Sequence, residues 1–158
     1  MSQMIEVRLG LRNTLRIDAS LQPIVRERNG WHRIDGLPNG PRRVRYELIR
    51  GRLHIESGAA RLHVQFRLRH SGFSWRGRRY DIRPMILFQP FGRGRVSILC
   101  DGRQIVNGRL TFTGVRLDYV APELEPLSAE LALGIALRGQ AYLDALAGGG
   151  GGDAFVLP

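Results

Sequence analysis

Arginine and aromatic side chains crowd into one short stretch of this chain. Trp75, Arg76, Arg78, Arg79 and Tyr80 lie within six positions of one another. The planar guanidinium group carries several N–H donors that match the oxygens of a phosphate or a carboxylate. The six candidate anion-binding residues are Arg76, Arg78, Arg79, Arg93, Arg95 and Arg103. We expect them to lie on hairpin ends that cluster into one surface, although ordinary cross-strand stacking of Arg78 on Trp75 would explain part of the pattern.

Two histidines could hold a divalent metal ion. A hairpin with a turn over residues 57–60 would set His54 opposite His63, with Glu56 diagonal to them, and imidazoles and carboxylates are metal ligands. Two histidines on the solvent face of a strand are more often plain polar surface, and His70 falls outside the register of this pair. We therefore predict no metal ion and no cofactor, and keep His54, His63 and Glu56 as the metal-binding alternative.

The single cysteine does not indicate catalysis. Cys100 precedes a tight turn and shares a predicted face with Val96 and Ile98, so we interpret it as a small core residue. Arg103 would lower the pKa of this thiol only at an open site. The sequence has no Ser-centred elbow, no metalloprotease helix motif and no phosphate-binding glycine loop, because residues 91–95 lack the spacing and the following helix. We predict no catalytic residue and a protein that is not an enzyme.

The charge is unevenly distributed along the chain. All 24 basic residues are arginine and the formal net charge is +10. Residues 1–110 hold 22 arginines and 8 acidic residues, net +14, whereas residues 111–158 hold 2 arginines and 6 acidic residues, net −4. A basic body attracts nucleic acid, anionic lipid or acidic protein through a field that salt screens. A general compositional bias toward arginine would give the same excess without any binding, and both explanations stay open.

The first 120 residues have the pattern of short strands joined by turns. Gly and Pro recur about every 8 to 12 residues, and the segments between them alternate polar with apolar residues. Residues 61–69 are the clearest case, with Leu62, Val64, Phe66 and Leu68 on one face. The other predicted strands are residues 5–11, 44–49, 53–56, 80–83, 95–100, 103–107, 109–113 and 115–120.

Turn chemistry predicts the register of three hairpins, because the turn fixes which residues face one another. A turn over residues 57–60 pairs Glu56 with Arg61, His54 with His63 and Arg52 with Gln65. The Arg76-Gly77 turn pairs Trp75 with Arg78 and Phe73 with Tyr80. The Asp101-Gly102 turn pairs Cys100 with Arg103 and Ile98 with Ile105. These predictions describe a local antiparallel meander.

After Pro122 the pattern changes to a helix over about residues 126–147. Pro126 suits the first helical position, and the glycines at 148–152 end the helix. Residues 131–137 are apolar almost all round, which is typical of a helix enclosed by protein or lipid. A membrane span needs about 20 predominantly apolar residues, and Gly134, Glu130 and Arg138 interrupt or bound this run. We expect one domain over residues 1–147, with the helix enclosed by the sheet, and a flexible glycine-rich tail at 148–158.

Three short motifs resemble the tubby C-terminal-like superfamily, which includes the LURP-one-related proteins and the phospholipid scramblases. Residues 73–84, FSWRGRRYDIRP, are similar to a W-x-G-x-x-Y-x-(L/I)-R-P strand pair in uncharacterised bacterial relatives. Residues 99–105 are similar to their L-x-D-G-x-x-(I/V) hairpin, and residues 122–127 to the acidic, proline-bearing start of their last helix. The resemblance covers about residues 44–147. It implies an antiparallel barrel closed around a central apolar helix, and some members bind phosphoinositides or act at membranes.

We therefore expect a mainly β fold, an antiparallel β-barrel closed around a C-terminal apolar α-helix. The expected function is a non-enzymatic binding module that engages a lipid head group or an acidic protein through its basic barrel surface. The alternatives are a nucleic-acid-binding protein and a small-ligand or enzymatic function at a barrel pocket, for which an enclosed helix would leave little room. The opening residues lack the features of a signal peptide. We expect no transmembrane span and a cytoplasmic protein that can lie at the membrane periphery.

Overall fold

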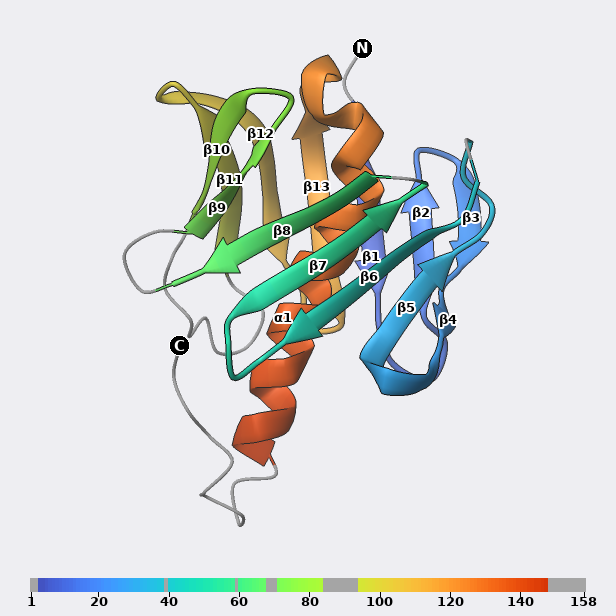
Figure 1. The fold of residues 1–158 in the computed structure, drawn as a ribbon. Coiled ribbons are helices and arrows are strands. Elements are labelled where there is room, and N and C mark those ends of the chain that lie inside the picture. The colour runs from blue at the N-terminus through green and yellow to red at the C-terminus, as the bar shows by residue number, and fades with distance from the viewer. Residues whose placement is uncertain (1–2, 39, 59, 68–70, 84–93, 148–158) are drawn as a thin grey trace.

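The chain folds into one long antiparallel sheet wrapped around one helix (Figure 1). The structure is a computed structural model, and it describes residues 3–38, 40–58, 60–67, 71–83 and 94–147. Within these residues the strands are β1 Ile5–Arg8, β2 Thr14–Ile17, β3 Ser20–Pro23, β4 Val25–Arg26, β5 Trp31–Ile34, β6 Arg42–Glu47, β7 Arg52–Ser57, β8 Ala60–Phe66, β9 Ser71–Trp75, β10 Arg78–Arg83, β11 Gly94–Cys100, β12 Arg103–Leu110 and β13 Gly114–Val120. The helices are two 3-10 segments, η1 Arg28–Gly30 and η3 Pro122–Leu127, and the α-helix α1 Ser128–Ala147.

The strands form a nearly closed barrel. From β4 to β13 each strand pairs antiparallel with the next one along the chain, and β13 then pairs with β1, which continues through β2 to β3. The two edges of the sheet, β3 and β4, are consecutive in sequence and separated only by the buried Ile24. The expected fold class, mainly antiparallel β with one C-terminal helix, is confirmed.

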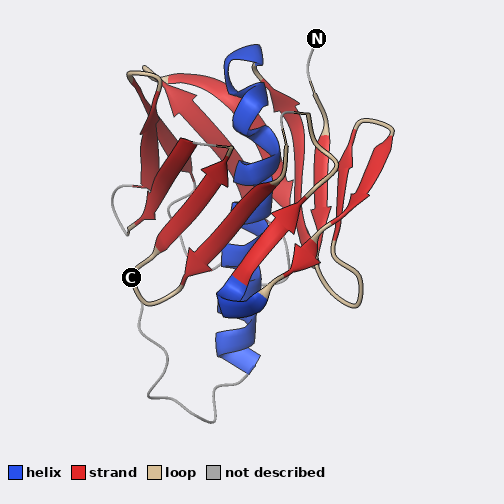
Figure 2. Ribbon diagram, turned by 45° about the vertical axis from the view of Figure 1, so that its right-hand side comes forward, coloured by secondary structure: helices blue, strands red, loops and turns tan. Residues whose placement is uncertain are grey.

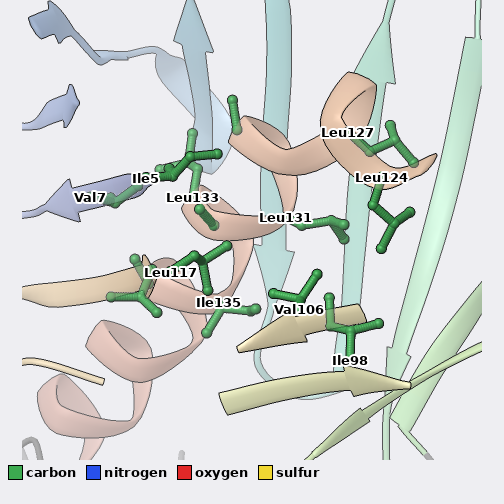
Figure 3. Close-up of a cluster of buried hydrophobic side chains, with 14 of the residues drawn as sticks. Ile5, Val7, Ile98, Val106, Leu117, Leu124, Leu127, Leu131, Leu133 and Ile135 are labelled. Carbon is green, nitrogen blue, oxygen red and sulfur yellow. The ribbon is translucent and has the colours of Figure 1, made fainter. Parts of the chain in front are cut away.

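Helix α1 runs through the ring of strands (Figure 2). Every residue from Ala129 to Leu137 is buried. Leu131, Leu133 and Ile135 point toward side chains from β1, β11, β12 and β13 (Figure 3). Twenty residues at about 1.5 Å each make a helix roughly 30 Å long, and its last turns project beyond the strands (Figures 1 and 2). A helix that is apolar all round is stable here because the barrel covers all of its sides.

The helix is held at two further points. Gly134 faces β7 where an added Cβ would overlap the Leu53 side chain, so only glycine allows this close approach. The fully buried Glu130 receives a hydrogen bond of 2.9 Å from Arg42 of β6, whose guanidinium also donates to the carbonyls of Pro126 and Pro38. The α-helix begins at Ser128 rather than near 126, because residues 122–127 form a 3-10 segment that contains Pro126.

The hairpin predictions are confirmed with one exception. The pairs His54–His63, Arg52–Gln65, Trp75–Arg78 and Cys100–Arg103 are present, as are Glu56–Arg61 and Phe73–Tyr80. Ile98, however, pairs with Val106 and not with Ile105, because a bulge between Ile98 and Leu99 shifts the register. The predicted strand 103–107 and the first two residues of the predicted strand 109–113 form one strand, β12, with Gly108 inside it, and residues 111–113 form the turn to β13. Residues 14–34, for which no strand was predicted, form β2 to β5.

The barrel has two ends that differ in composition. The helix-entry end holds the turns at 76–77 and 101–102 together with η3, where the chain enters α1. The helix-exit end holds the turns at 9–13, 27–30, 48–51 and 111–113, around the last turns of α1. Because neighbouring strands are antiparallel, consecutive turns alternate between these two ends. Residues 84–93 and 148–158, which include Arg93 and the predicted tail, lie outside the described residues.

Candidate functional site

The sequence-predicted arginines do not form one cluster. Arg76, Arg78 and Arg103 lie at the helix-entry end and Arg79 lies beside them on β10. Arg95 lies near the opposite end of β11, five residues before Cys100, which at about 3.4 Å per residue is roughly 17 Å away. Arg93 lies outside the described residues. The structure therefore divides this set between the two ends of the barrel.

The arginines at the helix-entry end already have protein partners. Arg78 Nη1 donates to Glu123 Oε2 at 3.0 Å, and Arg103 Nη2 donates to Oε1 of the same carboxylate at 3.4 Å. Tyr80 also donates its hydroxyl proton to Glu123, at 3.4 Å. The negative charge of Glu123 raises the pKa of Arg78. One carboxylate thus contacts two of the arginines at this end.

The two other arginines of that set also have contacts of their own. The Arg79 Nε lies 3.7 Å from Asp81 Oδ1. The Arg76 guanidinium lies 4.2 Å from the centre of the Trp75 ring. The expected stacking of Arg78 on Trp75 is therefore wrong, because the turn places Arg76 over the ring and directs Arg78 to Glu123.

The histidine pair lies on an outer face whose carboxylates have other partners. The rings of His54 and His63 are 4.7 Å apart. Glu47, however, contacts His54 Nε2 at 2.9 Å, while Glu56 accepts a hydrogen bond from Arg43 at 3.3 Å. Burial, followed by the charges of His54 and nearby arginines, lowers the pKa of His63. In the described part of the chain no group of three His, Cys, Asp or Glu side chains could hold a metal ion.

A row of arginines crosses the other outer face of the barrel. On β11, β12 and β13, Arg95 pairs with Arg109 and Arg109 with Arg116. The row continues from Arg116 to Glu6 on β1 and from Glu6 to Arg16 on β2. Neighbouring strands lie about 4.8 Å apart, so these charges are close neighbours. We define the basic row as Arg8, Arg16, Arg95, Arg109 and Arg116.

Carboxylates compensate the basic row only in part. Arg116 Nε lies 2.9 Å from Asp118, and Arg8 Nε lies 3.3 Å from Glu6. Among the described residues, Arg16, Arg95 and Arg109 have no carboxylate within ion-pair distance. Like charges directly opposite each other on a sheet are destabilising. An anion bound between them would relieve this repulsion.

Two exposed apolar side chains lie at the helix-exit end beside the basic row. Leu11, in the turn between β1 and β2, is fully exposed, and Phe112, in the turn between β12 and β13, is 70% exposed. The Leu9 N–H donates to the Thr113 carbonyl at 2.7 Å, so the two turns are neighbours. We call Leu11 and Phe112 the tip pair. Ile49 in the 48–51 turn and Leu143 on α1 are also exposed at this end.

The sequence analysis missed both the basic row and the tip pair. The strands predicted at 95–100, 109–113 and 115–120 place Arg95, Arg109 and Arg116 on polar faces, which was the available signal. The β11–β12 and β12–β13 hairpins align these three arginines, whereas the extension of the row to Arg8 and Arg16 requires the pairing of β13 with β1, which no short-range pattern specifies. Leu11 was predicted as the end of a strand, but β1 ends at Arg8 and leaves Leu11 in the turn.

The fold and the surface together define a nearly closed β-barrel with a central helix and a basic row in which Arg16, Arg95 and Arg109 have no carboxylate partner among the described residues. A scan against protein-family models, a search of curated proteins and a search of solved structures each found no match to this chain. Among the described residues no helix is long and apolar enough to cross a membrane.

Proposed function

We propose that this protein is a non-enzymatic binding module that docks on an anionic membrane surface, with the basic row and the tip pair facing the lipid. The observation that carries the proposal is the position of two exposed apolar side chains, Leu11 and Phe112, beside arginines that have no carboxylate partner. The resemblance to the tubby-like superfamily supports it, since some members of that superfamily act at membranes.

The two features fit the physical requirements of peripheral binding. Each arginine near an anionic surface contributes about 1 kcal/mol of attraction, which salt screens. Apolar side chains that enter the acyl boundary contribute about 25 cal/mol for each Å² removed from water. Neither contribution alone holds a protein firmly on a membrane. Arg12 lies next to Leu11 in the same turn and is exposed, so cationic and apolar groups alternate at the tip itself.

The tip pair favours a membrane over the other anionic partners. A single-stranded nucleic-acid site combines a basic groove with aromatic rings on which bases stack. In this protein the Arg76 guanidinium covers the Trp75 ring. Among the described residues in the turns of the helix-exit end, Phe112 is the one exposed aromatic residue. An acidic protein would pair with the basic row but would not require apolar side chains at the adjoining tips.

Charge reversal in the basic row should release the protein from anionic vesicles. For Arg95→Glu with Arg109→Glu, we expect about a tenfold or greater loss of partitioning onto phosphatidylserine/phosphatidylcholine vesicles at low salt, because two attractive charges become repulsive. Vesicle flotation with quantified recovery measures this. The matched control is Arg61→Glu with Arg76→Glu, which changes the net charge equally at the helix-entry end. Equal loss in both double variants, or equal wild-type recovery on pure phosphatidylcholine, would contradict the proposal.

Polar substitution of the tip pair should remove the part of membrane binding that salt does not screen. We expect Leu11→Ser with Phe112→Ser to abolish the recovery that wild type retains at about 0.5 M salt, where surface charges are strongly screened. The control is Leu21→Ser, which alters an exposed apolar side chain on β3. If the tip variant binds like wild type at all salt concentrations while a labelled oligonucleotide is retarded, the function is nucleic-acid binding instead.

A further inference from the structure

A pocket lies at the helix-exit end, where α1 leaves the ring of strands. Its volume is about 320 Å³, and it lies between the last turns of α1, the turn after β1 and the inner faces of β4 to β6. Leu9, Leu137 and Ala141 supply apolar surface, while Arg26, His32, Tyr46, Gln140 and Asp144 supply polar groups. The sequence analysis expected the helix to leave little room in the barrel. The pocket exists because the helix extends past the strands.

One wall of the pocket carries a cation and a neutral imidazole. Arg26 of β4 pairs directly with His32 of β5. His32 in turn pairs with Val44 of β6, which is buried, so this register position faces the interior of the barrel. The Gly30 carbonyl lies 3.2 Å from His32 Nδ1, and since a carbonyl only accepts, this nitrogen carries the proton and Nε2 is left as an acceptor. Burial, together with the charge of Arg26, lowers the pKa of His32, so the ring is uncharged at neutral pH.

The opposite wall carries an anion on the helix. Gln140 Nε2 donates to Asp144 Oδ1 at 2.9 Å, which orients the carboxylate one turn further along α1. Arg26 and Asp144 line the same pocket, yet they form no ion pair with each other. Within the described part of the chain neither has an oppositely charged partner at ion-pair distance. Two exposed residues of opposite charge therefore line the pocket, more than 4 Å from each other.

We propose that this pocket binds a small zwitterion of the α-amino-acid type. The ligand carboxylate would pair with the Arg26 guanidinium, and the ligand ammonium would donate to Asp144. The ligand's carbon atoms would lie against Leu137 and Ala141. A cavity of 320 Å³ is at the lower limit of ordinary ligand pockets, which span about 300–1,000 Å³. The same zwitterion occurs as a free amino acid and as the head group of phosphatidylserine. This site goes beyond the proposed function, because it does not use the basic row.

Calorimetric titration of the full chain with free L-amino acids tests the pocket. We expect saturable binding of small neutral amino acids, weakened about ten- to a hundredfold by Arg26→Ala and by Asp144→Asn, because each substitution removes one charge-assisted interaction. Propanoate and propylamine, which each keep one of the two charges, should bind weaker by a similar factor. Arg28→Ala is the matched control, since Arg28 is exposed in the turn that follows β4 but does not line the pocket. Thermal unfolding checks that every variant is folded.

A second arm of the experiment separates the two sources of the zwitterion. Phosphatidylserine and phosphatidylglycerol vesicles carry the same net charge, but only the first presents an amino-acid group. A preference for phosphatidylserine that Arg26→Ala and Asp144→Asn remove identifies the lipid head group, whereas binding of free amino acids without such a preference identifies a soluble ligand. Failure of the membrane proposal would lower binding to both kinds of vesicle equally. No saturable signal from any amino acid or vesicle, or equal binding in both pocket variants, would overturn the inference.

Discussion

Replacement of Glu130 by alanine is expected to lower the free energy of unfolding by about 3–5 kcal/mol, because it leaves a buried guanidinium without its carboxylate. The Glu130 side chain is fully buried and that of Arg42 is 11% exposed, so water cannot replace the lost partner. The pair joins the first turn of α1 to β6, 88 residues away in sequence. Urea-induced unfolding followed by circular dichroism measures the change.

Replacement of both charged residues by apolar ones separates the effect of an unpaired Arg42 from the effect of lost packing. Because two desolvated charges are expensive to bury, a well-packed apolar pair in their place is often neutral or stabilising. We expect Arg42→Met combined with Glu130→Leu to recover most of the stability that Glu130→Ala loses. A Glu130→Ala variant within about 0.5 kcal/mol of wild type, the range of ordinary surface substitutions, would show that the pair contributes little.

The same pair should give the protein a measurable dependence on pH. Burial raises the pKa of the Glu130 carboxyl above its ordinary value of 4.5, and Arg42 offsets only part of that effect. The folded state therefore binds the Glu130 proton more tightly than the unfolded state does. The contribution of this proton to the free energy of unfolding is complete below pH 4.5, and it is lost as the pH rises through the folded-state pKa of Glu130. The glutamine in the Glu130→Gln variant does not titrate. As the pH rises through the folded-state pKa of Glu130, we expect the variant to become more stable relative to wild type.

Alanine at Gly134 should destabilise the protein although it improves helix propensity. Its Cβ would overlap the end of the Leu53 side chain, which is fully buried. Overpacking of this kind costs about 1–3 kcal/mol, against a propensity gain of about 1 kcal/mol. The matched control is Gly139→Ala in the same helix, where no atom lies within 4 Å of the added Cβ. We expect that control to stabilise the protein by up to about 1 kcal/mol.

A double-mutant cycle identifies the cause of the Gly134 effect. Leu53→Ala alone should cost about 2–5 kcal/mol through the cavity it creates. In the Gly134→Ala background the same substitution should cost at least about 1 kcal/mol less, because the new methyl group fills part of that cavity. Additive effects of the two substitutions would show that Leu53 does not limit how closely α1 approaches β7.

Local patterns in the sequence were sufficient for much of the barrel. The alternation over residues 61–69 and the turns at 76–77 and 101–102 depend on neighbouring residues alone, and the structure confirms β8 and the pairs Trp75–Arg78 and Cys100–Arg103. The apolar run at 131–137 predicted an enclosed helix for the same reason. The register failed only at Ile98, where a bulge, which the turn does not specify, inserts one residue.

The early strands and the charge partners were not predictable in this way. β2, β3 and β4 are four residues or fewer, with weak alternation. β2 and β3 extend the sheet from β1, whereas β4 pairs with β5 at the opposite edge. Glu130 was interpreted as a residue that bounds the apolar run of the helix, whereas the structure pairs it with Arg42 from β6. Arg78 and Arg103 were interpreted as free donors, whereas Glu123 from η3 lies between them.

The sequence by itself determined the C-terminal helix, most strands from β6 onward and the excess of positive charge, because alternation, turn residues and composition act between near neighbours. Only the tertiary structure decided which charges are compensated. Pairing of β1 with β13 joined Arg8 and Arg16 to the row of Arg95, Arg109 and Arg116 and placed the Leu11 turn beside the Phe112 turn. The extension of α1 past the strands created the pocket between Arg26 and Asp144. These arrangements join residues far apart in the chain, and their energies depend on distances that no local pattern fixes.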